Sequence, residues 1–254
     1  MSGYTTPALL LRRINYGDYD FIINLFTLDR GKVSVIAKAA KKSVKRFGGI
    51  LELFSALEVV INPGRGKGLP VLQEAALVHP YTNIRSDVVK TAYASYWSEL
   101  VNTWMEEYER QDLIFNLLRH VFTELDEGAK EPRVLSILFQ IRFMMLSGLA
   151  PNLSNCSRCG QAVEKVASRE VYFSLSGGGV VCGACGPSSG RRVALSRGTV
   201  KQLAWIQQRD LEKVSRLQFS EPSIVEGLAF CEAFVPYHLG KEPKSLKFLR
   251  QIRR

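Results

Sequence analysis

The sequence predicts an α+β protein of two domains, with a β-barrel at residues 1–80 and a mostly helical domain at residues 81–254. Three observations lead to this prediction. Short apolar runs separated by turn residues fill the first domain, and apolar residues then recur at three- and four-residue steps. Two Cys-x-x-Cys pairs interrupt the helical pattern. A length of 254 residues is typical of two domains.

Short apolar segments of the first domain have the pattern of β-strands. They cover residues 8–14, 21–27, 33–37, 57–61 and 69–76, and several are rich in β-branched and aromatic residues. The second and third segments form a predicted hairpin, because Gly31 lies in the turn between them and adopts positive φ easily. Five strands of this length predict a small closed or nearly closed barrel, and the OB-fold is the commonest barrel of this size.

A basic segment at residues 38–49 connects the third and fourth predicted strands. A loop of this kind can follow a phosphate backbone by charge and insert an aromatic side chain, here Phe47, between bases. The alternative is a solvated basic loop without a ligand. The segment contains no anion, and its cations are Lys38, Lys41, Lys42, Lys45 and Arg46.

The turn at residues 64–68 reads Gly-Arg-Gly-Lys-Gly and adds the cations Arg65 and Lys67. It resembles a phosphate-binding loop only superficially, because a Walker A motif needs Ser or Thr after its Lys and this chain has Gly68 there. We expect a flexible hairpin turn.

The charge of the chain favours a polyanionic partner. The formal net charge is +10 and the sequence pI is about 9.5, which is the usual electrostatic footprint of nucleic-acid binding. A basic surface without a specific ligand is the alternative. No apolar run approaches the roughly 20 residues of a membrane helix, and residues 1–11 lack the pattern of a signal peptide, so we expect a cytoplasmic protein without a membrane partner.

Helical periodicity follows Pro80. Tyr93, Tyr96 and Trp97 recur at helical spacing in the first predicted helix, and this spacing favours a place in the core over a base-stacking platform. Pro236 is expected to kink or end a later helix. The predicted helix starts are Ser86, Asp112, Pro132, Ser196 and Ser220.

The C-terminal residues 241–254 are strongly basic. Lys244, Lys247 and Arg250 recur at helical spacing, so a helix here would have one basic face that could extend a nucleic-acid path. The alternative is a frayed, solvated tail.

Two cysteine pairs predict a zinc finger at residues 153–187, inserted between helices. Cys156 and Cys159 form one pair, Cys182 and Cys185 the other, and a Gly follows each pair where the chain must turn. Four cysteines at this spacing are typical of a structural Zn²⁺ site, which leaves no open position for catalysis. Two disulfides or four unpaired thiols are the alternatives, but disulfides need an oxidising compartment. Cys231 is expected to be a buried core thiol.

The sequence predicts neither catalytic residues nor an organic cofactor. None of the three histidines belongs to a recognisable catalytic motif. Asp18 and Asp20 could bind Mg²⁺ in principle, although two acids in a turn are a weak signal. The protein is therefore not expected to be an enzyme.

The chain resembles the RecO family of bacterial DNA repair and recombination mediators. The resemblance rests on Phe-Thr-Leu-Asp-Arg-Gly-Lys at 26–32 with the basic segment after it, on residues 142–153 leading into Cys156, and on residues 238–249. It implies an N-terminal OB-fold, a helical domain containing the zinc finger, and DNA binding. It also implies strand annealing, loading of the recombinase, and the partners RecR and the C-terminal tail of single-strand-binding protein. Ala39 and Ala40 depart from the Gly that relatives commonly have in the basic loop.

The resulting prediction is a mediator of the RecF pathway that binds single- and double-stranded DNA by charge, with structural Zn²⁺ and a location at the bacterial nucleoid. A zinc-ribbon scaffold that binds only proteins, and a nuclease that uses Asp18 or Asp20, are the alternatives. The predicted DNA contacts are Lys32, Lys38, Lys41, Lys42, Lys45, Arg46, Arg65, Lys67, Lys244, Lys247 and Arg250.

Overall fold

The computed structural model of the chain describes residues 3–64, 68–128, 130–168, 170–186, 190–214 and 217–253. Its contacts divide the chain into two compact units, which we call unit 1 (Met1–Ala129 with Pro243–Arg254) and unit 2 (Lys130–Glu242). The domain bounds 1–80 and 81–254 remain a prediction. Within the described ranges, no helix is both long enough and apolar enough to cross a membrane.

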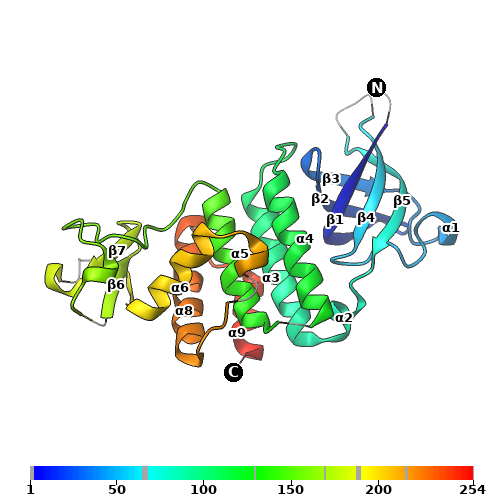
Figure 1. Ribbon diagram of the computed structural model, residues 1–254. Coiled ribbons are helices and arrows are strands. Elements are labelled where there is room, and N and C mark those ends of the chain that lie inside the picture. The colour runs from blue at the N-terminus through cyan, green and yellow to red at the C-terminus, as the bar shows by residue number, and fades with distance from the viewer. Residues whose placement is uncertain are drawn as a thin grey trace. The chain divides into compact units, whose positions relative to one another are not determined.

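Unit 1 contains a closed barrel of five strands, as predicted (Figure 1). The strands run in the spatial order β1-β2-β3-β5-β4, and β4 pairs with β1 to complete the ring. The bounds of the strands are β1 Tyr4–Tyr16, β2 Asp20–Thr27, β3 Gly31–Ala37, β4 Ala56–Asn62 and β5 Val71–His79.

Alternation along the strands fills the barrel interior. Ile23 and Val35 are fully buried in the core, whereas their neighbours Ile22 and Ile36 lie on the opposite face of the sheet. All neighbouring strands are antiparallel except β3 and β5, which pair in parallel at Ile36 and Val71.

The turn between β2 and β3 confirms the prediction for Gly31. This residue has φ +65°, and its carbonyl accepts a hydrogen bond from the Thr27 hydroxyl at 2.9 Å. A Cβ at this position would lie 1.8 Å from the carbonyl oxygen of Glu109. Both the backbone conformation and the close approach of another segment therefore require glycine here.

The helices of unit 1 pack beside the barrel. Phe115 of α4 contacts Phe26 of β2, with 6.0 Å between ring centroids, and Phe122 of α4 contacts Phe54 at 5.7 Å. The predicted core role of Tyr93, Tyr96 and Trp97 is confirmed, since all three are buried. The bounds of the helices are α1 Val44–Phe47, α2 Thr82–Ser86, α3 Val88–Trp104, α4 Asp112–Glu127 and α9 Lys244–Ile252.

Two predicted helix caps of unit 1 are wrong by one residue. Asp87, and not Ser86, caps α3, because its carboxylate accepts hydrogen bonds from the amides of Val89 and Lys90. Asp112 is the first residue of α4, not its cap. The C-terminal residues form the helix α9, whose Leu246 and Leu249 are buried in unit 1, so the alternative of a frayed tail is wrong.

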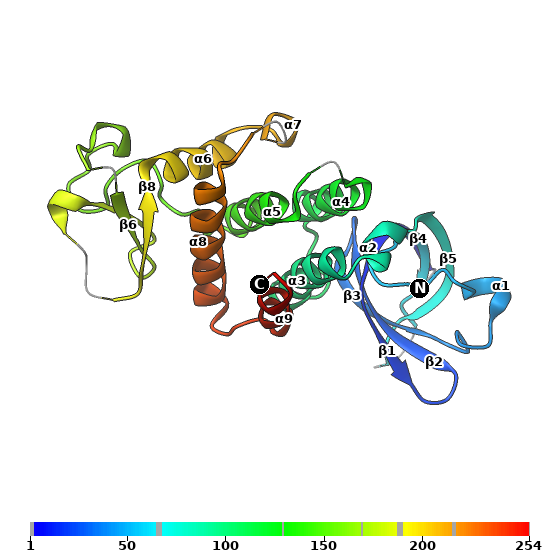
Figure 2. The same ribbon diagram turned by 90° about the horizontal axis from the view of Figure 1, so that it is seen from below.

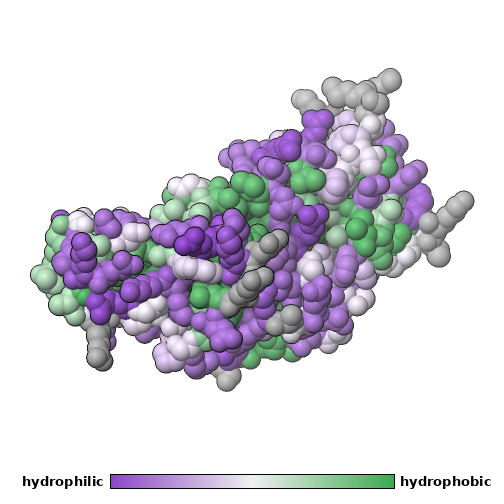
Figure 3. Space-filling model, viewed as in Figure 1, coloured by the Kyte–Doolittle hydropathy of each residue, from purple (hydrophilic) through white to green (hydrophobic). Residues whose placement is uncertain are grey.

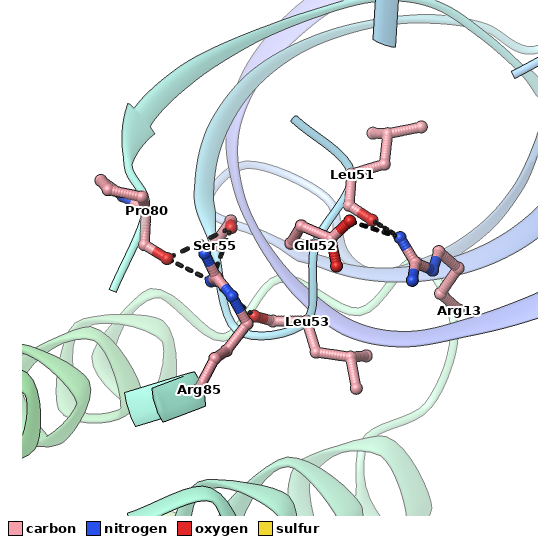
Figure 4. Close-up of polar contacts among 7 residues, drawn as sticks. All are labelled: Arg13, Leu51, Glu52, Leu53, Ser55, Pro80 and Arg85. Carbon is pink, nitrogen blue, oxygen red and sulfur yellow. Dashed lines mark hydrogen bonds and ion pairs between the residues drawn. The ribbon is translucent and has the colours of Figure 1, made fainter. Parts of the chain in front are cut away.

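Figure 4 shows two arginines that hold the segment before β4. Arg13 of β1 donates a hydrogen bond to the carbonyl of Leu51 at 2.6 Å. Arg85 of α2 donates to the carbonyls of Leu53 at 3.2 Å and of Pro80. These bonds satisfy carbonyl groups that lie outside the strands, and they connect α2 to the barrel.

Unit 2 combines helices with a three-stranded sheet of order β7-β6-β8, of which Figure 2 labels β6 and β8. The predicted helix starts at Pro132, Ser196 and Ser220 are confirmed, as first residue or N-cap. Pro236 does not end α8, which continues to Leu239. The bounds are α5 Pro132–Leu146, β6 Glu170–Ser174, β7 Gly179–Cys182, β8 Arg192–Ser196, α6 Arg197–Gln208, α7 Leu211–Val214 and α8 Glu221–Leu239, with short 3-10 turns at Val163–Lys165 and Gly183–Cys185.

The face of the molecule in Figure 3 is mostly hydrophilic, with hydrophobic residues in separate patches. This pattern agrees with a net charge of +10 on a chain that is 46% hydrophobic, because the apolar residues fill the cores.

Gly31→Ala should destabilise unit 1 strongly. The added Cβ meets a backbone carbonyl and not a movable side chain, and the residue keeps positive φ. We expect the free energy of unfolding to fall by about 3 kcal/mol or more, measured by urea denaturation.

Gly17→Ala is the matched control. Gly17 also has positive φ, at +55°, but nothing lies within 4 Å of an added Cβ. The free energy of unfolding should fall by only about 1 kcal/mol, the cost of placing a residue with a Cβ at positive φ. Equal losses in the two variants would contradict the close approach of Glu109.

Candidate metal centre and nucleic-acid interface

The four predicted zinc ligands converge in unit 2. The sulfurs of Cys156, Cys159, Cys182 and Cys185 all lie within 4.8 Å of one another. The Cys159 and Cys182 sulfurs are 3.8 Å apart, about the edge of a tetrahedron with metal–sulfur bonds of about 2.3 Å. All five cysteines of the chain are free, so the disulfide alternative is wrong.

Backbone hydrogen bonds bring the two cysteine pairs together. Asn152, before the first pair, exchanges hydrogen bonds with the start of β7: its amide donates to Gly178 at 2.8 Å, and its carbonyl accepts from Val180 at 3.0 Å. Because β7 leads directly into Cys182, this pairing places the second pair beside the first. Gly160 and Gly186 follow the pairs with φ of +74° and +67°, as predicted.

The pKa values of two thiols in the cluster, Cys156 and Cys185, are shifted in opposite directions. Burial disfavours the thiolate of Cys156, but hydrogen bonds from the backbone amides of Cys159, Cys182 and Arg158 outweigh it and lower the pKa of Cys156 to about 6. Hydrogen bonds with the sulfurs of Cys182 and Cys159 raise the pKa of Cys185 to about 12. A metal ion would remove this opposition, because a coordinated thiol is deprotonated.

An aromatic contact attaches the finger to the helices of unit 2. Phe173 of β6 is fully buried against Phe230 and Phe234 of α8, with ring centroids 4.7 and 5.4 Å away. Cys231, on the same helix, is a buried core thiol as predicted, and burial raises its pKa. The cysteine cluster therefore adjoins a sheet that is itself part of the core of unit 2.

The basic segment of unit 1 is anchored in the barrel. Ala40, Phe47 and Leu51 belong to the hydrophobic core of the barrel, and Phe47 is only 4% exposed. The prediction that Phe47 inserts between bases is therefore wrong. Burial of its phenyl ring in the core stabilises the folded state by about 2 kcal/mol, so the ring contributes to folding and not to ligand binding.

Hydrogen bonds hold the same segment beside the β1–β2 hairpin. The Ala39 amide donates to the Asp20 carboxylate at 2.8 Å, and the Lys41 amide donates to the Tyr19 carbonyl at 3.0 Å. Lys41 Nζ also donates to the Gly17 carbonyl at 3.0 Å. Ala39 has φ +53°, a conformation that glycine adopts more easily.

Four predicted DNA contacts on this segment are accessible to solvent, although the side chains of Lys41 and Arg46 also donate hydrogen bonds to neighbouring backbone carbonyls. Lys38, Lys41, Lys42 and Arg46 are exposed, and within the described residues none of them is in an ion pair. Lys38 and Arg46 line a groove of about 730 Å³ together with residues of β5. The segment therefore presents positive charge that the described part of the protein does not neutralise by ion pairing.

Two family models match the chain: recombination protein O N terminal over residues 1–81 and recombination protein O C terminal over residues 85–247. The chain belongs to the recombination protein O (RecO) family. A protein of Desulfosudis oleivorans named DNA repair protein RecO is 45% identical over 258 residues, which cover 100% of this chain and 99% of that protein. Proteins of the same name from Desulfatibacillum aliphaticivorans and Anaeromyxobacter dehalogenans are 43% and 32% identical, over 100% and 99% of this chain and 99% and 98% of those proteins.

Membership of the RecO family confirms the predicted resemblance and associates the chain with DNA repair and recombination. The match includes both the barrel and the unit with the cysteine cluster. The OB-like barrel and the four clustered thiols are the features of this RecO-family chain that support DNA binding and metal binding.

The other predicted DNA contacts of this RecO-family chain lie elsewhere. Lys32 is half-buried, and its Nζ donates a hydrogen bond to the Asn102 carbonyl at 2.9 Å. Lys244, Lys247 and Arg250 lie on α9, which packs against α3. Arg65, Lys67 and the side chain of Lys45 lie outside the described residues.

Two exposed tyrosines near the basic segment were missed by the sequence reasoning. Tyr16 ends β1 and is 53% exposed, and Tyr19 lies in the turn before β2 and is 47% exposed. The signal that could have found them is the pair of aromatic residues on either side of the turn residues Gly17 and Asp18.

Cys156→Ser should remove the metal. With one of four ligands lost, bound metal should fall from about one equivalent per chain toward zero, and the thermal midpoint of unit 2 should fall with it. Elemental analysis and thermal denaturation measure the two effects. Cys231→Ala is the control, because it removes a buried thiol of the same unit and should keep the metal. A Cys156→Ser protein with full metal content would contradict the assigned ligand set.

Metal affinity should fall as the pH is lowered, because protons compete with the metal for the thiolates. Proton uptake by any of the four predicted ligands, Cys156, Cys159, Cys182 or Cys185, would release the metal. The visible absorption of the cobalt-substituted protein reports this loss during an acid titration. Absorption that does not change between neutral and mildly acidic pH would contradict the expectation.

Proposed function

We propose that this RecO-family chain is a mediator of DNA repair and homologous recombination in the RecF pathway. It binds single- and double-stranded DNA, anneals complementary strands, and helps to load the recombinase onto strands coated by single-strand-binding protein. The observation that carries the proposal is the group of exposed cations that the basic segment presents on the barrel, within a family named for recombination.

Charge neutralisation explains how such a surface would promote annealing. Two complementary strands repel each other through their phosphates, and cations that bind these phosphates lower the repulsion. Lys38, Lys41, Lys42 and Arg46 are held by an anchored loop, so they need little ordering on binding. No bond is made or broken in this mechanism, and the proposed protein is not an enzyme.

The metal in this proposal is Zn²⁺ with a structural role. Four thiolates in a closed cluster match the ligand preference of zinc and leave no position for substrate or water. Its contribution is to hold the sheet of β6, β7 and β8 in the core of unit 2.

The proposed partners are RecR and the C-terminal tail of single-strand-binding protein, and the proposed location is the bacterial nucleoid. Asp20 supports this reading over a nuclease that uses Asp18 and Asp20, because its carboxylate already accepts the hydrogen bond of the Ala39 amide. A protein-binding scaffold without DNA affinity would fail the following test.

Replacing Lys38, Lys41, Lys42 and Arg46 together by Gln should weaken DNA binding and its dependence on salt. The logarithm of the affinity for a single strand falls with the logarithm of salt concentration by about 0.7 for each phosphate contact. The slope should therefore flatten by up to about 2.8 if all four side chains contact phosphates. Fluorescence anisotropy across a salt series measures the slope.

The matched control removes four exposed cations from unit 2, namely Lys165, Arg191, Lys201 and Arg209, by the same change to Gln. The net charge falls equally in both variants. If the two slopes are equal, general charge and not the basic segment binds DNA, and the interface assignment is wrong. If the native protein shows no salt-sensitive DNA binding, the scaffold alternative is favoured.

A further inference from the structure

An apolar row crosses the outer face of the barrel near the basic segment. Strand register places Ile14 opposite Ile22, Ile22 opposite Ile36, and Ile36 opposite Val71. Their chain neighbours Ile23, Val35 and Leu72 are core residues, so the row lies on the outward face. Tyr16 is two residues from Ile14 and therefore projects from the same face.

Part of this outer face is covered by polar contacts. Asn24 Nδ2 donates to Asn102 Oδ1 of α3 at 2.7 Å, and the Ser34 hydroxyl contacts the Glu107 carboxylate at 2.5 Å. Away from these contacts, apolar and aromatic side chains of this face are exposed to solvent. Ile14 is 37% exposed and Tyr16 is 53% exposed. Apolar and aromatic groups left in solvent beside covered polar ones indicate a ligand surface.

Tyr19 lies in the turn between β1 and β2. Figure 2 shows this hairpin extending from the barrel. The Lys42 ammonium lies over one face of its ring, 3.4 Å from the centroid. The hydrogen bonds from Lys41 to Gly17 and to Tyr19 hold this tip against the basic segment. The ring of Tyr19 and the cations Lys41 and Lys42 are therefore held together by contacts within the protein itself.

The charge beside the apolar row selects the class of ligand. Lys38 lies two residues after Ile36 and, with Arg46 and Val71, lines the groove of about 730 Å³, whose lining contains two cations and one acid, Glu74. A surface that offers both flat apolar area and unneutralised cations matches a single nucleic-acid strand, whose bases stack on aromatic rings while its phosphates meet cations. The bases of a duplex are stacked inside it and cannot use such rings without unstacking.

We propose that Tyr16 and Tyr19 select single-stranded nucleic acid by stacking on unpaired bases, while the basic segment holds the phosphates of the same strand. This inference rests on the proposed function of the barrel and adds its substrate preference. Duplex binding, in contrast, uses the cations alone.

The test compares the Tyr16→Ala/Tyr19→Ala protein with the Tyr16→Phe/Tyr19→Phe protein, both as the full metal-loaded chain. The probes are a fluorescent oligothymidylate of about 16 nucleotides, an abasic strand of the same length, and a duplex. The Ala protein should lose at least about tenfold affinity for oligothymidylate and little for the other two probes. The Phe protein should keep its affinity, because stacking needs the ring and not the hydroxyl. Each single Ala variant, checked for an unchanged thermal midpoint, should show part of the loss.

Three outcomes would overturn the inference. An equal loss on the abasic strand would mean that the tyrosines act through the phosphate contacts or through folding. No loss on any probe would assign the surface to a different partner, such as a protein. If the native protein shows no salt-sensitive binding to any probe, both the proposed function and this inference are overturned. The first two outcomes, in contrast, overturn the inference alone.

Discussion

The burial of Phe47 and Ala40 in the barrel core is the constraint on which the candidate interface depends. The two side chains fix the course of a segment that would otherwise be a long loop of like charges. Between them lie Lys41, Lys42 and Arg46, which must point outward because the inward positions are filled. The same apolar burial that stabilises the barrel therefore orients the cations, and no ion pair is required to position them.

A second constraint acts in unit 2, where four sulfurs share one small volume. The pKa of Cys156 is lowered by backbone hydrogen bonds, and the pKa of Cys185 is raised by hydrogen bonds with its neighbouring sulfurs. Phe173 packs against Phe230 and Phe234 of α8, so it connects the sheet that contains part of the cysteine cluster to the helical core. Both units have an apolar core, and unit 2 adds a cluster of four thiols that could bind a metal ion.

Much of this could be predicted from the sequence, because the relevant signals are local. Strand composition predicted the barrel, spacing predicted the cysteine cluster, and Pro132 and Ser220 predicted helix starts. Phe47 was placed wrongly because a residue next to cations reads as exposed, and only the closed barrel shows that it faces inward. Tyr16 and Tyr19 were missed because their exposure depends on which part of the outer face α3 covers, and that is a long-range property of the fold. Asp87 replaced Ser86 as a cap because α2 ends where Ser86 stands.

The path of the chain through the two units has a consequence for how this protein can vary. Chain connectivity makes unit 2 an insertion, since unit 1 includes both the residues before it and the helix α9 after it. The entropy of closing a loop rises only with the logarithm of its length, by about 0.6 kcal/mol for each doubling. The stability of unit 1 therefore depends little on the number of residues between 129 and 243. Insertions, deletions and even loss of the cysteine pairs in unit 2 can accumulate over evolutionary time while the barrel continues to fold.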